Sequence, residues 1–281
     1  MKYLLLILFC FSFSIAFSQI IEDLKTNKQT AQFLSKYIDK KYTFKYVFNK
    51  EKEVDNEDFN EYVKKNDLDN NGFIDLVVDG YSSLILVLNN GNNNFKELKL
   101  NKILQYDFEP ILDKIYKYQD DVVLVVKSED YLNDTFKLDS LTFKYGQLVS
   151  YKRNKPKNLN QINQIKFSTN GCFGNCPIFE ITIKSDYSFE YIGIKYTQVK
   201  GKKIGKISST YYNELVGLLY YSDIMNLKDF YSVNWTDDQT GTLAIQFENE
   251  EIKQISDYGL RGNIDLKAIY NKLNDILNHI Q

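Results

Sequence analysis

The 281-residue chain has one histidine, three cysteines, three prolines and one tryptophan. Hydrolytic triads usually use histidine as the base, and the single histidine, His279, lies near the end of the chain, where we expect it to face solvent. Zinc sites commonly need four Cys or His ligands, so zinc binding is not favoured. The sequence also lacks a phosphate-binding glycine-rich loop and a Gly-x-Ser-x-Gly elbow. These absences argue against the common hydrolase, zinc and phosphate-binding classes, and the sequence identifies no catalytic residue.

The composition is that of a folded protein with no general affinity for polyanions. Hydrophobic residues make up 43% of the chain and charged residues 26%, with a formal net charge of −2. A nearly neutral chain gives no electrostatic attraction to nucleic acid. The length suggests two domains. Beyond the N-terminus no stretch is apolar enough to span a bilayer, so we expect no nucleic-acid partner and no transmembrane segment.

Residues 1–18 have the pattern of a cleavable signal peptide. Lys2 supplies an early positive charge, residues 4–17 are mostly apolar, and cleavage is expected after Ser18. A membrane anchor needs about 20 apolar residues, which is more than this run contains. Cys10 lies in the middle of the run, which argues against lipidation. The sequence therefore predicts an exported protein, periplasmic or secreted.

Removal of the signal peptide leaves two cysteines, Cys172 and Cys176, in the stretch Gly-Cys-Phe-Gly-Asn-Cys-Pro at 171–177. In an oxidising compartment this pairing predicts a disulfide. Closing so short a loop stabilises a protein by only ~2 kcal/mol, so the bond would fix a local turn. Free thiols remain an alternative. Thiol redox chemistry is disfavoured, since three residues separate the cysteines and no βαβ pattern surrounds them.

The stretch from Asp67 to Asp75 reads Asp-Leu-Asp-Asn-Asn-Gly-Phe-Ile-Asp. It places oxygen-bearing side chains at its first, third, fifth and ninth positions, and the glycine at the sixth position permits a sharp bend. Alternate residues of such a loop can converge on one point, and hard oxygen ligands at this spacing suit Ca²⁺. A helix-loop-helix calcium site would need Glu at the twelfth position, where this chain has Val78.

Residues 67–78 resemble a single strand-flanked calcium loop of the FG-GAP and VCBS-type repeats. The resemblance implies calcium bound by four side chains and by the carbonyl of a fifth residue, namely Asp67, Asp69, Asn71, Asp75 and Phe73. Because the motif occurs once, the propeller fold of those families is not implied. The alternative is a polar turn in which Asp and Asn accept backbone hydrogen bonds. Three carboxylates within nine residues repel one another, which favours a cation.

Residues 19–150 predict a β-rich N-terminal domain. A helical period covers 22–40, and Asn89–Asn94 is expected to be a turn. Strands are expected at Tyr42–Phe48, Ile74–Val78, Leu84–Leu88, Phe95–Leu100, Val122–Lys127, Thr135–Leu138 and Leu141–Val149. Residues 151–163 form the expected linker, because they are basic, contain a proline and show no apolar periodicity.

Residues 164–281 predict a C-terminal domain with the order β-β-β-α-β-β-α. Ser208 or Ser209 can cap a helix that runs to about Tyr221, and the final helix carries an apolar face from Leu266 to Ile280. The lysine-rich run Lys200–Lys206 is expected to be a solvated loop. The expected strands are Gln164–Ser168, Phe179–Ile183, Phe189–Ile194, Thr242–Glu248 and Ile252–Ser256. The whole chain is therefore predicted to be α+β, with two mainly antiparallel-sheet domains.

The segment from Ile165 to Ile280 resembles a family of bacterial domains of unknown function. The shared features are the Gly-Cys-Phe-Gly-x-Cys-Pro turn, the strand that follows it, a hairpin at Ser185–Ser188, and a Tyr-Gly step, Tyr258–Gly259, before the last helix. Tyr187 stands where the family usually has Gly, so the hairpin is expected to use a turn that a bulky residue tolerates. The resemblance implies fold and export but no reaction.

Paired carboxylates are the remaining route to catalysis. Asp237 and Asp238 beside Trp235 are the one place where acids adjoin a sugar-stacking ring, but neighbouring strand residues point to opposite faces. We therefore expect an exported non-catalytic binding or structural module of the bacterial cell envelope, with a calcium-stabilised loop and no other cofactor. An envelope protein or a glycan is the partner considered. The alternative is an envelope hydrolase that uses paired carboxylates.

Overall fold

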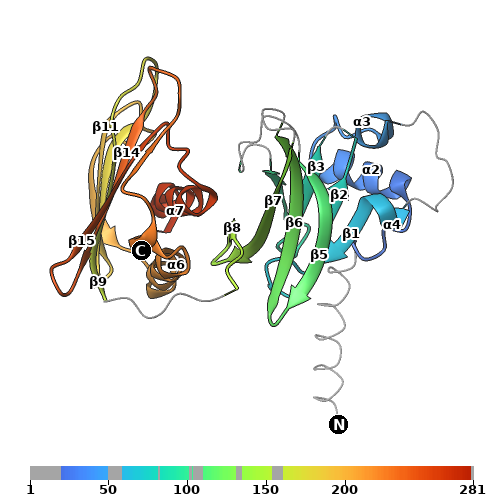
Figure 1. Cartoon of the computed structure of the whole chain (residues 1–281), viewed down its shortest axis with the longest axis horizontal. Coiled ribbons are helices and arrows are strands. Elements are labelled where there is room, and N and C mark those ends of the chain that lie inside the picture. Colours follow the sequence, from blue (N-terminus) through green and yellow to red (C-terminus); the bar gives the residue numbers. More distant parts are fainter. Residues whose placement is uncertain are drawn as a thin grey trace, which may run out of the picture. The chain divides into compact units, whose positions relative to one another are not determined.

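A computed structural model describes residues 20–49, 59–81, 83–100, 103, 110–130, 135–153 and 161–279 (Figure 1). The expected signal peptide and residues 154–160 of the expected linker lie outside these ranges. The chain divides into two compact units, of which the first ends at Phe143 and the second begins at Lys144. Helices combine with mainly antiparallel strands, which confirms the α+β class. Over the described ranges, no helix is long and apolar enough to cross a membrane.

The first unit begins with three short helices, α2 (Asn27–Tyr37), α3 (Phe44–Phe48) and α4 (Phe59–Tyr62). The strand predicted at Tyr42–Phe48 is wrong. The Thr43 side chain accepts a hydrogen bond from the backbone N–H of Tyr46 and starts α3. The rings of Phe44 and Phe48, four residues apart, contact each other with centroids 5.4 Å apart, which is the spacing of a helix rather than of a strand.

A four-stranded antiparallel sheet follows, in the order β1-β2-β3-β4. Its strands are β1 (Val63–Asn66), β2 (Asp75–Asp79), β3 (Leu84–Asn89) and β4 (Phe95–Lys99). The three strands predicted in this region are confirmed as β2, β3 and β4, with ends that differ by at most one residue, whereas β1 was not predicted. Residues of β1, β2 and β3 pack with the helices α2, α3 and α4 in one apolar core. This packing holds the β1–β2 hairpin in place.

Four further strands form a second sheet in the order β5-β6-β7-β8. They are β5 (Ile111–Tyr118), β6 (Asp121–Asp130), β7 (Thr135–Lys144) and β8 (Gln147–Ser150). The strand predicted at Val122–Lys127 lies in β6. The strands predicted at Thr135–Leu138 and Leu141–Val149 have the wrong bounds, because β7 runs through both and the chain then turns at Tyr145 and Gly146, both of which have positive φ. Strand β5 was not predicted.

The second unit is built on a seven-stranded sheet in the order β12-β11-β10-β9-β14-β15-β13. Neighbouring strands are antiparallel except for β13 and β15, which are parallel. Figure 1 shows two helices, α6 and α7, on the same face of this sheet. The elements are β9 (Ile162–Thr169), β10 (Ile178–Lys184), β11 (Ser188–Lys195), β12 (Gly201–Lys206), α6 (Ser209–Tyr221), η2 (Ile224–Asn226), β13 (Phe230–Ser232), β14 (Thr240–Phe247), β15 (Ile252–Tyr258), α7 (Ile264–Asn274) and η3 (Ile276–His279).

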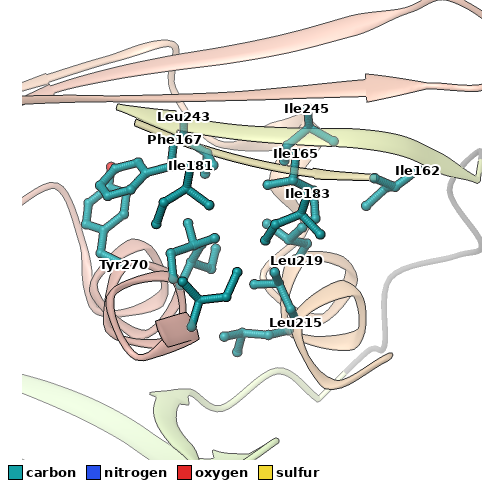
Figure 2. Close-up of a cluster of buried hydrophobic side chains, with 14 of the residues drawn as sticks. Ile162, Ile165, Phe167, Ile181, Ile183, Leu215, Leu219, Leu243, Ile245 and Tyr270 are labelled. Atoms are coloured by element: carbon teal, nitrogen blue, oxygen red, sulfur yellow. The ribbon is translucent and has the colours of Figure 1, made fainter. Parts of the chain in front are cut away.

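The core of this unit follows from alternation along the strands. Every second residue points to the helices, so Phe167 pairs directly with Leu243, and Ile165 with Ile245, across β9 and β14. All four side chains are at most 1% exposed, and Figure 2 shows them between the sheet and the two helices. Serine at 208 caps α6, as predicted, by accepting a hydrogen bond from the backbone N–H of Tyr211.

Two strands of this sheet, β12 and β13, are missing from the predicted order. The run Lys200–Lys206 was expected to be a solvated loop, but Gly201–Lys206 pairs with β11 as an edge strand. Its lysines stay in solvent, as is common on edge strands that must not pair with other chains. The expectation for Tyr187 is also wrong. This residue has φ +68°, the conformation that favours glycine, and its ring packs edge-on against Tyr212 at 5.2 Å.

Candidate metal centre

The predicted calcium loop is the connection of the β1–β2 hairpin. Asn66 pairs with Asp75 at the end of the ladder, so residues 67–74 span the turn between the two strands. Asn70 and Gly72 have φ values of +58° and +88°. The glycine tolerates this conformation because it has no Cβ. These two residues bend the chain back toward Asp67.

The bend brings together the carboxylates of Asp67, Asp69 and Asp75. One oxygen of each lies within 4.8 Å of the others. Ca²⁺ binds oxygen at 2.3–2.6 Å, so two oxygens on one ion are separated by at most about 5 Å. Asp75 is fully buried, whereas the other two are partly exposed. The three oxygens are therefore close enough together to contact one calcium ion.

Backbone hydrogen bonds within the loop hold the two outer carboxylates. Asp67 accepts bonds from the N–H groups of Asn71 and Gly72, both at 3.0 Å. Asp69 accepts from the N–H of Asn71 at 3.2 Å. Such bonds also occur in a polar turn without metal. They give the loop its shape without an ion, and each carboxylate oxygen has a further lone pair that could contact a cation.

Asp75 is the least ordinary carboxyl group of the loop. Its two oxygens accept bonds from the backbone N–H groups of Leu68 and Asn89, each at 2.7 Å. Burial raises the pKa of Asp75 to about 7, against the effect of these two bonds, and the negative charges of Asp69 and Asp67 raise it further. Burial also raises the pKa of Asp69. Within the described part of the chain, no lysine or arginine forms an ion pair with these three acids.

Of the five predicted ligands, the structure groups three. Asn71 lies in the loop, but its amide oxygen accepts a bond from the N–H of Phe73 at 2.8 Å. Its amide nitrogen donates to the carbonyl of Asn89 at 2.9 Å. The ring of Phe73 packs on Gly91, where a Cβ would come within 2.8 Å of it. The part of Asn71 and of the Phe73 carbonyl in ion binding therefore stays a prediction.

Sequence reasoning missed the importance of Asn89. It was assigned to a plain turn, yet this nearly buried residue at the end of β3 contacts the loop in three ways. The backbone N–H of Asn89 donates a hydrogen bond to Asp75, and its backbone carbonyl accepts one from Asn71. Its side-chain amide nitrogen donates to the carbonyl of Ile74 at 3.3 Å. The signal in the sequence was an asparagine at the end of an apolar strand, but its partner lies 14 residues earlier.

The arrangement suits ion binding better than acid-base catalysis. A carboxyl group with a pKa near 7 could serve as a general acid. Asp75 is 0% exposed and its two oxygens accept hydrogen bonds from backbone donors, so the carboxyl group is not open to solvent. The other acid pair considered, Asp237 and Asp238, does not lie in a strand, contrary to the expectation above. Asp238 lies in an irregular segment between β13 and β14 and accepts a hydrogen bond from the indole nitrogen of Trp235 at 2.9 Å.

The second predicted site is the cysteine pair. Cys172 and Cys176 lie at disulfide distance, with Cα atoms 5.7 Å apart, as the sequence predicts. The loop they close also contacts the Trp235 segment, because the N–H of Phe173 donates to the carbonyl of Asp237 at 3.1 Å. The Phe173 side chain is 91% exposed. The disulfide thus fixes a surface turn.

The single histidine is exposed, as expected. The ring of His279 stacks on that of Tyr211, with ring centroids 4.4 Å apart.

Comparison with known families identifies the second unit only. Residues 163–277 match a family described as a domain of unknown function, DUF6438. The C-terminal half carries a domain of unknown function. The match does not include the carboxylate loop of the first unit and assigns no activity. No curated protein and no solved structure matches the chain.

Proposed function

We propose that the protein is an exported, non-catalytic binding or structural module of the bacterial cell envelope, stabilised by Ca²⁺ in its first unit. The ion would be bound by Asp67, Asp69 and Asp75, with Asn71 and the carbonyl of Phe73 as further ligands. The observation that carries the proposal is the cluster of three carboxylate oxygens within 4.8 Å of one another. A buried carboxylate is unfavourable unless it is neutralised or paired, and a cation would provide the missing charge.

The donor set favours calcium over other divalent ions. All three grouped donors are carboxylate oxygens, whereas zinc and the later transition metals prefer nitrogen and sulfur. Mg²⁺ demands a small octahedral shell, while Ca²⁺ accepts six to eight oxygens in flexible geometry. The loop that connects the two strands of a hairpin can supply part of such a coordination shell, with water molecules as the remaining ligands. The expected effect is to stiffen the β1–β2 connection.

Export is supported by the signal-peptide pattern of residues 1–18 and by the disulfide between Cys172 and Cys176. Disulfides persist in oxidising compartments and are rare in the cytosol. The periplasm and the medium both fit this chemistry. Calcium is abundant outside cells, where modules typically bind it with a Kd of about 10⁻⁴ to 10⁻³ M. A weak site would therefore be occupied there.

Calorimetric titration with CaCl₂, combined with thermal melting, tests the calcium site in the full chain. With the Kd given above, 10 mM calcium should stabilise the protein by about 1 to 3 kcal/mol at neutral pH through mass action. Asp69→Ala should abolish binding and this gain while leaving the calcium-free protein folded, since it removes one of three repelling charges. Asp113→Ala is the matched control, because Asp113 is an acid on β5 beside Lys114, outside the loop.

The two possible results separate an ion site from a turn. If the wild type and Asp113→Ala gain stability with calcium and Asp69→Ala does not, the cluster binds the ion. If wild type and Asp69→Ala melt alike with and without calcium, the loop is only a polar turn and the proposal fails.

A further inference from the structure

The second unit contains a pocket that none of the features above explains. Its volume is about 560 Å³, within the range of about 300–1,000 Å³ that small-molecule sites occupy. It lies where β9, β10 and β11 meet the C-terminal end of α7 and the start of η3. The described residues that line it are Phe167, Thr169, Pro177, Phe179, Ile181, Tyr191, Tyr196, Thr197, Gln198, Val199, Gln239, Leu260, Asn274 and Leu277.

The described lining of this pocket is uncharged. It has no Asp, Glu, Lys, Arg or His, although charged residues make up 26% of the chain. Its polar groups are side-chain amides and hydroxyls, and its apolar part is rich in aromatic rings. A site without a countercharge disfavours an ionic ligand, because the ligand's charge would lose water without gaining a partner. The lining therefore selects a neutral ligand that has both apolar and hydrogen-bonding surface.

One hydrogen-bond acceptor in the pocket is fixed in advance. The amide nitrogen of Gln239 donates to the carbonyls of Asn170 and Pro177, at 2.8 and 2.5 Å. These bonds use both amide protons and set the orientation of the side chain, which is only 8% exposed. Among the described residues, the amide oxygen of Gln239 has no donor. A ligand hydroxyl would satisfy it.

Two walls of the pocket pack directly on glycines of the sheet. The connection between β11 and β12 crosses Gly193 so closely that a Cβ there would lie 1.9 Å from the carbonyl oxygen of Val199. On the other side, Leu260 packs on Gly241, where a Cβ would lie 2.2 Å from its Cδ2 atom. Both glycines belong to the sheet and leave space for a wall residue. The walls are thus built into the fold.

Both walls also carry a bulky residue in the left-handed region. Tyr196 has φ +57° and Leu260 has φ +53°, a conformation that costs an L-residue roughly 1–2 kcal/mol. The Leu260 turn is held by the buried carboxylate of Asp257, which accepts bonds from the N–H groups of Arg261 and Gly262 at 3.1 and 2.8 Å. Backbone strain that the surrounding structure maintains is typical of ligand sites.

We propose that this pocket binds an uncharged saccharide. A sugar ring presents apolar C–H faces and a rim of hydroxyls, which match aromatic rings and neutral amides respectively. Tyr196 lines the pocket and is 45% exposed, so part of its ring is accessible for stacking, and the Lys195 ammonium lies 4.7 Å from the ring centroid. Gln239 would accept a sugar hydroxyl. This names a ligand for the binding module proposed above, but it rests on the second unit alone and does not require calcium.

Ligand-observed NMR and calorimetry on the full chain test the proposal. The probes are maltose, cellobiose and N,N′-diacetylchitobiose as neutral sugars, galacturonic acid and glucosamine as charged ones, and indole as an apolar ring. At least one neutral disaccharide should bind with a Kd on the order of 10⁻³ M, and the charged sugars should bind at least about tenfold more weakly.

Three variants place the binding in the pocket. Tyr196→Ala should weaken the neutral sugar about tenfold by removing the stacking ring. Gly241→Ala should also weaken it, because the new methyl group pushes the flexible end of Leu260 into the pocket. Phe230→Ala removes an exposed aromatic side chain outside the pocket and should change nothing. Circular dichroism and melting curves confirm that each variant folds.

Four outcomes overturn the proposal. The first is no binding by any of the neutral disaccharides at 20 mM, about 20 times the expected Kd. The second is equal binding of charged and neutral sugars. The others are sugar binding that Tyr196→Ala leaves unchanged in a folded protein, and binding of indole alone. Failure of this test leaves the calcium proposal intact, because the carboxylate cluster lies in the other unit.

Discussion

The pH dependence of calcium stabilisation tests the unusual environment of Asp75. The group has a pKa of about 7 in the folded protein, against 3.8 as its ordinary value. Because the folded state holds this proton more tightly than the unfolded chain does, the calcium-free protein should lose stability as pH rises from about 4 to about 7. At about 1.4 kcal/mol for each pH unit, the loss due to Asp75 is at most about 4 kcal/mol.

Calcium should oppose this loss, because in the proposed site it would bind the ionised carboxylate. At pH 7.5 Asp75 is mostly ionised, and 10 mM calcium with a Kd of about 10⁻⁴ to 10⁻³ M gives about 1 to 3 kcal/mol. At pH 5 a proton competes with calcium for the Asp75 carboxylate. Because the pKa of Asp75 lies about two units above this pH, calcium binding should be weaker by about 100-fold. The gain from 10 mM calcium should then be at most about 0.4 kcal/mol.

The measurement is a set of melting curves at pH 5 and pH 7.5, with and without 10 mM CaCl₂. The calcium-free slope alone is not specific, because burial also raises the pKa of Asp79 and Asp257. The difference between the two calcium conditions isolates the loop. Asp69→Ala should show no difference at either pH. An equal calcium gain at pH 5 and pH 7.5 would refute the argument that a buried, protonated Asp75 controls the site.

Three further results are expected. Mass spectrometry of the exported protein should show a chain that begins near Gln19, and a chain that begins at Met1 or lipid on Cys10 would contradict this. Alkylation without reductant should leave Cys172 and Cys176 unlabelled, and two labelled thiols would mean that the disulfide does not form. Gly193→Ala should destabilise the protein by about 1–3 kcal/mol through overpacking, since the new Cβ would lie 1.9 Å from a backbone carbonyl oxygen. Gly171→Ala is the control. The nearest atom to its new Cβ is a side-chain methyl at 3.5 Å, so no loss of stability is expected. Denaturant titration of both variants provides the test, and equal stability would show that the loop above Gly193 moves freely.

The sequence predicted those parts of the fold that depend on local pattern. Alternation along β14 and β10 was readable because each strand buries every second residue. Ser208 was recognisable as a helix start because its hydroxyl acts within one turn. The segment at 42–48 was misread as a strand, because a short apolar run fits either period until its partners are known. The edge strand β12 was missed because its pairing depends on β11 rather than on its own polar residues.

The same division applies to the candidate sites. Spacing alone identified the Asp67–Asp75 loop and the cysteine pair, because in both the interacting groups lie within nine residues of one another. It could not identify Asn89, which reaches Asp75 only after β2 and β3 have paired. Nor could it reveal the raised pKa of Asp75, because burial is a property of the packed hairpin.

The sequence by itself determined the short-range features of this protein: the carboxylates and glycine of the Asp67–Asp75 loop, the two cysteines of a tight turn, the helix caps and the alternating strands. Those features follow from backbone geometry over a few residues. Tertiary structure alone decided the burial and the altered pKa of Asp75, the support of the loop by Asn89, and the neutral pocket between Gly193 and Gly241. These features depend on segments that are far apart in the sequence and contact one another only in the folded protein.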